Sequence, residues 1–100
     1  MDAAGLGPFE QNAPLMIAGR TYRPDFLWRA LRAILEIDSF EHHFLRRDWQ
    51  RTLDRHFVLE AAGYSVIHVP PSALEDRAAF VARVRVWLTS RHRDQLTSGA

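Results

Sequence analysis

The sequence predicts a small mixed α/β domain, and three observations lead to this fold class. First, the chain has 100 residues, which suffices for one hydrophobic core. Second, residues alternate between two faces at 33–38 and 64–69, as they do in β-strands. Third, apolar residues recur every three or four positions at 44–62 and 76–90, as they do in helices. Strands before and between helices indicate a mixed sheet with a helix packed on it.

The first part of the chain predicts three strands. Residues 13–17 form an apolar run that stops at the turn signal Ala18-Gly19-Arg20. Residues 21–28 favour extended structure, but Pro24 has no N–H for a sheet and predicts an edge position or a bulge. Residues 33–38 are the best candidate for a central strand. Its two predicted faces carry Ala33, Leu35 and Ile37, and opposite them Ile34, Glu36 and Asp38.

The second part predicts helix, strand and helix. We expect the first helix at 44–62 to end at Gly63, a residue type favoured just after helices. A strand follows at 64–69 and ends at the prolines 70–71. The second helix covers 76–90. The apolar stripe of the first helix is Leu45, Trp49, Leu53, Phe57 and Ala61, and that of the second is Phe80, Val81, Val84, Trp87 and Leu88.

The elements therefore follow the order strand, strand, strand, helix, strand, helix, in one domain at 13–90. Residues 1–12 are predicted to be an irregular lead-in, and residues 91–100 a polar tail that frays. Cysteine is absent, which excludes disulfides and thiolate metal sites. Neither a signal peptide nor a long apolar run is visible, so we expect a cytoplasmic protein without a membrane partner. All 13 basic residues are arginine, a side chain that can bind phosphates bidentately.

The predicted hairpin of residues 21–28 and 33–38 brings carboxylates together. With its turn between Ala30 and Leu31, opposed residue numbers add up to 61, so that Asp25 faces Glu36 and Arg23 faces Asp38. Opposed carboxylates repel unless a cation lies between them, and oxygen-rich clusters suit Mg²⁺ or Mn²⁺. The alternative is an exposed edge at which Arg23 pairs with Asp38, and Arg32 with Glu36.

Several short motifs in this region resemble those of one enzyme family. They are Arg23-Pro24-Asp25-Phe26, Glu36-Ile37-Asp38, His43, and the helix end from Leu59-Glu60-Ala61-Ala62-Gly63 to Tyr64-Ser65-Val66. The pattern, over residues 19–88, resembles small bacterial endonuclease-like domains related to the very short patch repair endonuclease, in the PD-(D/E)XK nuclease superfamily. The resemblance implies a restriction-endonuclease-like α/β sandwich and Mg²⁺-dependent hydrolysis of phosphodiester bonds in DNA.

The resemblance also assigns residues to roles. Asp25 matches the metal-binding aspartate and Glu36 the second acidic position. Asp38 lies where the superfamily usually has a lysine, and His43 matches a histidine of this branch, a candidate general acid or base. A metal held by Asp25 and Glu36 would polarise a phosphoryl oxygen and activate a bound water.

Arginines on the first helix are candidate contacts for DNA. Arg47, Arg51 and Arg55 recur every fourth residue and form one basic stripe, which together with Arg23 could bind backbone phosphates. The alternative is a solvated helix face in which these arginines pair with neighbouring aspartates.

The chain also departs from the family pattern. Only a dozen irregular residues precede residue 13, where the family usually has a helix; Ser39 replaces a glycine, and Thr52 and His56 stand where the family shows aspartates. These departures leave a second hypothesis open, a catalytically weak or inactive nuclease-fold module that binds DNA or a protein. They also lead us to expect a homodimer or a partner chain that completes the fold, because a missing helix would leave a sheet face or edge uncovered.

Overall fold

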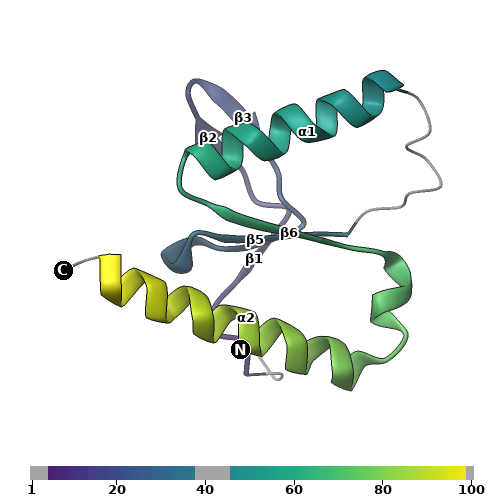
Figure 1. The fold of residues 1–100 in the computed structure, drawn as a ribbon, viewed down its shortest axis with the longest axis vertical. Helices are drawn as coiled ribbons and strands as arrows, with labels where there is room; N and C mark the ends of the chain where they lie inside the picture. The colour runs from purple at the N-terminus through teal and green to yellow at the C-terminus, as the bar shows by residue number, and fades with distance from the viewer. Residues whose placement is uncertain (1–4, 38–45, 99–100) are drawn as a thin grey trace.

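The computed structural model describes residues 5–37 and 46–98. Its main feature is a four-stranded sheet in the order β1-β4-β5-β6 (Figure 1). The strands are β1 (Glu10–Gln11), β4 (Phe26–Trp28), β5 (Ala33–Ile37) and β6 (Ser65–Val69). β4 runs antiparallel to β1 and β5, whereas β5 and β6 are parallel. The predicted mixed sheet is therefore confirmed.

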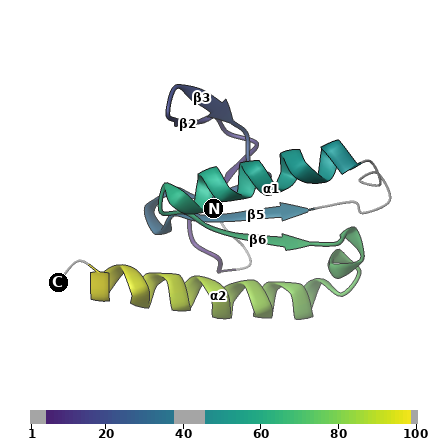
Figure 2. The same cartoon turned by 45° about the horizontal axis from the view of Figure 1, so that its top comes forward.

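Two helices cover opposite faces of this sheet (Figures 1 and 2). α1 (Arg46–Ala61) follows β5 in the chain and precedes β6. α2 (Arg77–Ser98) follows β6 and a short 3-10 helix, η3 (Pro71–Leu74). Because both faces carry a helix, the uncovered face expected from the sequence is not found in the described residues, although β1 and β6 remain edge strands.

The core consists of two apolar clusters, one on each side of the sheet. The cluster under α1 contains Leu15, Leu27, Ile34, Leu59 and Val66. The cluster under α2 contains Trp28, Ala33, Leu35, Val84 and Leu88. Successive residues of β5 alternate between the two clusters, as the period of a strand requires. The predicted inward face of the second helix is confirmed by the burial of Val84 and Leu88.

The predicted register of the central hairpin is confirmed. Phe26 pairs with Leu35 and Leu27 with Ile34, so opposed residue numbers add up to 61. Residues 21–28 are nevertheless not one strand, because the chain leaves the sheet pattern around the buried Pro24. Residues before it form β3 (Arg20–Tyr22), which pairs with β2 (Leu15–Ile17) in a separate two-stranded sheet.

Both ends of the chain are more regular than the sequence predicts. The lead-in holds β1, and the Phe9 ring packs against Phe26 and Trp28 at 5.8 and 5.5 Å between ring centroids. In the predicted tail, α2 continues to Ser98. There the Arg91 guanidinium donates to the carbonyl oxygen of Leu31 at 3.0 and 3.2 Å, so a long-range contact holds this part of the helix to the 3-10 turn between β4 and β5.

The end of α1 agrees with the sequence. Gly63 has φ +94°, a left-handed conformation that glycine adopts without a steric penalty. Its N–H donates to the carbonyl of Glu60 at 2.9 Å, and the N–H of Tyr64 donates to that of Leu59 at 3.0 Å. These two bonds form a Schellman motif, which ends the helix and leads the chain into β6.

Candidate functional site

Asp25 and Glu36 meet at the end of the hairpin on the α1 side of the sheet. The backbone N–H of Asp25 donates to Glu36 Oε2 at 3.1 Å, and the N–H of Ile37 donates to Asp25 Oδ2 at 2.8 Å. Glu36 is thus held by the backbone of the segment that leads into β4, and Asp25 by the backbone of β5. Glu36 is 6% exposed, whereas Asp25 is exposed to solvent. The pair therefore combines a buried, fixed carboxylate with one that solvent or a ligand can reach.

Arg55 of α1 supplies the positive charge at this pair. Its Nη1 donates to Glu36 Oε1, and its guanidinium carbon lies 5.8 Å from the centre of the Tyr22 ring. Burial lowers the pKa of the Arg55 guanidinium from its ordinary value, while Asp25 and Tyr22 act in the opposite direction. The side chain of Arg55 is 31% exposed. The Arg55 guanidinium thus compensates the negative charge of Glu36. Such a partner is needed because an unpaired buried charge is strongly destabilising.

Two histidines lie next to this charged group, and the sequence analysis did not single them out as a pair. His68 is the β6 residue in register with Glu36. His56 Nδ1 and His68 Nε2 lie 3.1 Å apart, with the rings stacked at 5.2 Å. At that distance one nitrogen donates and the other accepts. His56 Nε2 also lies 3.5 Å from Glu60 Oε1. The alternation of residues 64–69 indicated on which face of the sheet His68 lies. The contact with His56 could not be predicted in the same way, because it depends on how α1 is turned about its axis.

The other predicted site residues are placed as follows. Asp38 and His43 lie outside the described residues. Arg47 lies in the first turn of α1, and its side chain is likewise not described. Arg51 is exposed, and Arg23 is exposed with its Nη1 donating to the carbonyl of Asn12 at 3.3 Å. Of the arginines predicted to bind phosphate, these two present guanidinium groups to solvent.

The predicted orientation of α1 is wrong in two respects. Arg55 points to Glu36 and is not part of an exposed basic stripe. The described part of the predicted apolar stripe faces outward, since Leu53 is 50% and Phe57 73% exposed. Among the side chains of α1 that the structure describes, the buried one is Leu59, which lies four positions after Arg55. The need of Glu36 for a counter-charge explains why the row of Arg55 and Leu59 faces the sheet.

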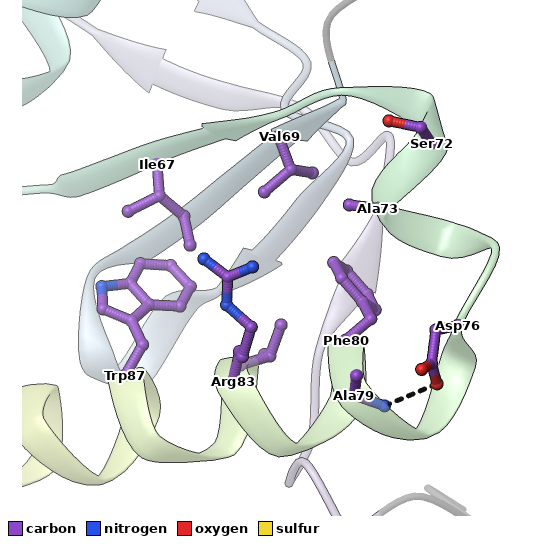
Figure 3. Close-up of a pocket in the computed structure, with 10 residues that line it drawn as sticks. Ile67, Val69, Ser72, Ala73, Asp76, Ala79, Phe80, Arg83 and Trp87 are labelled. Carbon is purple, nitrogen blue, oxygen red and sulfur yellow. Dashed lines mark hydrogen bonds between the residues drawn. The ribbon is translucent and has the colours of Figure 1, made fainter.

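A pocket of about 420 Å³ lies on the opposite side of the sheet, between β6, η3 and α2 (Figure 3). Its wall is mainly apolar, with Ile67, Val69, Phe80, Val84 and Trp87 among the lining residues. Asp76 at its edge accepts the N–H of Ala79 at 3.1 Å and so caps the start of α2. No residue predicted from the sequence as a site residue lines this pocket.

The donor set of Asp25 and Glu36 suits a hard cation. Mg²⁺ and Mn²⁺ prefer oxygen ligands, and Mg²⁺ sites in enzymes often use one or two carboxylates together with waters and substrate phosphates. Asp25 is accessible for this role, while Glu36 shares its Oε1 with Arg55. Within residues 5–37 and 46–98, no group of three or more His, Cys, Asp or Glu side chains is arranged to hold a metal ion.

Comparison of the chain with protein-family models, with curated proteins and with solved structures gave no match. Among the described residues, no helix is both long and apolar enough to cross a membrane.

Proposed function

We propose that this chain is a nuclease-fold domain that binds DNA and hydrolyses its phosphodiester bonds with the help of Mg²⁺ or Mn²⁺. The observation that carries the proposal is that Asp25, just before β4, and Glu36 of β5 are hydrogen-bonded to each other's chain segments, Glu36 by the N–H of Asp25 and Asp25 by the N–H of Ile37. A mixed sheet between two helices also suits a restriction-endonuclease-like arrangement. The resemblance of the motifs around Asp25 and Glu36 to PD-(D/E)XK nucleases points in the same direction.

The two carboxylates and Arg55 have different tasks in this proposal. Asp25 and Glu36 hold the cation, which supplies charge to a phosphoryl oxygen and lowers the pKa of a bound water. Glu36 is fixed by the backbone N–H of Asp25, so that its geometry is set before a ligand arrives. Arg55 pairs with Glu36 and compensates its negative charge in the buried position. The exposed Arg23 and Arg51 contact backbone phosphates and position the DNA.

A second candidate is an inactive nuclease-fold module that binds DNA without cutting it. The observation in its favour is the ion pair of Arg55 with Glu36, because an internal cation already neutralises the carboxylate that a metal would use. DNA binding without metal-dependent cleavage would identify this alternative.

The experiment is cleavage of supercoiled plasmid in Mg²⁺ and in Mn²⁺, with EDTA as one control. We expect nicking by the wild-type protein, and at least a hundredfold slower nicking by Asp25→Asn. The matched control is Asp54→Asn, which removes an exposed aspartate of α1 and should cleave like the wild type. Cleavage that persists in Asp25→Asn would place the activity elsewhere. No cleavage by well-folded protein at any metal concentration would refute the nuclease proposal.

DNA binding is tested separately by its salt dependence. Each phosphate contact contributes about one unit to the slope of log affinity against log salt concentration. Arg51→Gln and Arg23→Gln should each flatten that slope by about one unit. Binding that is absent at low salt would refute both the nuclease and the DNA-binding candidates.

A further inference from the structure

The pocket between β6, η3 and α2 lies on the far side of the sheet from the carboxylate pair, and the proposed function does not use it (Figure 3). Its volume is about 420 Å³, and small-molecule sites have volumes of about 300–1,000 Å³. The pocket lies at the edge of the sheet, because β6 is an edge strand and no further strand of the described residues follows it. We call this cavity the α2 pocket.

The wall of the α2 pocket is apolar and incompletely buried. Val84, one of its lining residues, is 2% exposed and belongs to the core cluster under α2. Ile67, Val69, Phe80 and Trp87 pack against that cluster but are only partly buried. A ligand that covers these side chains removes further apolar surface from water, which stabilises the complex. The rings of Phe80 and Trp87 suit a flat aromatic body in particular.

Arg83 supplies a positive charge to this apolar wall. Figure 3 shows its side chain extending from α2 toward β6, between Trp87 and Phe80. Among the residues that the structure describes, no carboxylate or carbonyl oxygen is paired with the Arg83 guanidinium. Arg29 and Arg55, by contrast, are each held by a glutamate. A guanidinium with free donors can bind a carboxylate through two parallel hydrogen bonds.

The acidic residue of the pocket, Asp76, lies away from Arg83. It caps the start of α2 by accepting the N–H of Ala79 at 3.1 Å. Figure 3 shows Asp76 and Arg83 on opposite sides of Phe80, and seven positions of a helix correspond to about 10 Å along its axis. Negative charge on a ligand is therefore stabilised at the Arg83 end of the pocket and repelled at the Asp76 end. The pocket suits a ligand that carries one anionic group at one end of an apolar body.

We propose that the α2 pocket binds a small aromatic carboxylic acid in its ionised form, with the carboxylate at Arg83 and the ring system against Phe80 and Trp87. The apolar wall provides most of the affinity, and the guanidinium selects the acid over a neutral analogue of the same shape. The α2 pocket and the carboxylate pair lie on opposite sides of the sheet, so the inference does not depend on nuclease activity.

The first test is isothermal titration of the protein at neutral pH with 2-naphthoate, up to about 5 mM. The neutral comparison ligand is 2-naphthalenemethanol, which has the same rings. We expect the acid to bind about tenfold more tightly than the alcohol, and Arg83→Gln to remove that difference by weakening the acid alone. Arg77→Gln is the matched control, because Arg77 is an exposed arginine of α2 that does not line the pocket. It should bind both ligands like the wild type.

Three results of this titration would overturn the proposal. They are the absence of acid binding by the folded wild type, equal affinities for acid and alcohol, and wild-type affinity for the acid in Arg83→Gln. Circular dichroism checks that the variants are folded, which the exposure of Arg83 and Arg77 makes the expected result.

The second test locates the ligand in the α2 pocket. Ala79 lines the pocket, so the larger side chain of Ala79→Phe should narrow it and weaken acid binding about fivefold or more. Ala78 is the neighbouring alanine of the same helix, is also exposed and does not line the pocket. Ala78→Phe should therefore bind like the wild type. Equal affinities of the two phenylalanine variants for 2-naphthoate would show that the acid binds elsewhere and would overturn the proposal.

Discussion

Removal of the Arg55 guanidinium tests whether this side chain supports the carboxylate pair. In Arg55→Met, Glu36 would lose its charged partner in a site where its side chain is only 8% exposed. Breaking a buried ion pair by removal of one partner costs about 3–5 kcal/mol. The Arg55 side chain is 31% exposed, so water can partly take its place. We therefore expect the free energy of unfolding to fall by about 2–3 kcal/mol, at or below the lower end of that range.

The assay is thermal and urea unfolding followed by circular dichroism. For a domain of this length, 1 kcal/mol corresponds to a change of about 4–8 °C in Tm, so the expected fall is about 10–20 °C. Replacing both partners, in Arg55→Met with Glu36→Met, should restore most of the stability, since no charge is then left buried.

Arg51→Met is the matched control for this prediction. Arg51 lies one turn earlier in the same helix and is exposed, so its replacement should change the free energy of unfolding by less than about 0.5 kcal/mol. Equal stabilities of Arg55→Met and Arg51→Met would refute the argument that Arg55 compensates a buried charge.

Three further changes test other parts of the structure. Leu59→Ala should lower the free energy of unfolding by about 3 kcal/mol, because Leu59 is 0% exposed. Leu53→Ala should lower it by less than about 1 kcal/mol, because Leu53 is 50% exposed. Equal losses of stability in calorimetry would contradict the orientation of α1. Ala18→Asn should stabilise the β2–β3 turn by about 0.5–1 kcal/mol, because residue 18 has φ +51° and asparagine tolerates that conformation better; a lower Tm would contradict this. The hydrogen bond from Arg29 lowers the pKa of Glu10, so its contribution to stability is present at neutral pH and is lost as the pH falls below about 4. The Tm difference between wild type and Glu10→Gln should therefore narrow as the pH is lowered through the acid range, and a difference that does not narrow on acidification would disprove this.

The sequence predicted the central hairpin well for a physical reason. The short connection between the two strands sets which residues face each other, and with its turn between Ala30 and Leu31 opposed residue numbers add up to 61. The same register, continued by one residue, places Asp25 opposite Glu36, and the N–H of Asp25 donates to the Glu36 carboxylate. Pro24 was recognised as an exception to regular pairing, but its effect of dividing the strand in two was not.

The orientation of α1 could not be predicted from its periodicity. Leu53 and Phe57 form one row at a spacing of four, and Arg55 and Leu59 form another. If hydrophobicity alone decided which side of the helix is buried, the row of Leu53 and Phe57 would face the core. The structure buries the second, because Glu36 needs a cation and that contact comes from a distant strand. The same long-range origin explains why the helical continuation of α2, held by Arg91, was not expected.

Binding of Mn²⁺ to the folded protein, followed by electron paramagnetic resonance, tests most directly whether Asp25 and Glu36 form a cation site. The account predicts one bound ion per chain, loss of that ion in Asp25→Asn, and unchanged binding in Asp54→Asn. Binding that is equal in both variants, or absent from the folded wild type at millimolar Mn²⁺ with DNA present, would contradict it.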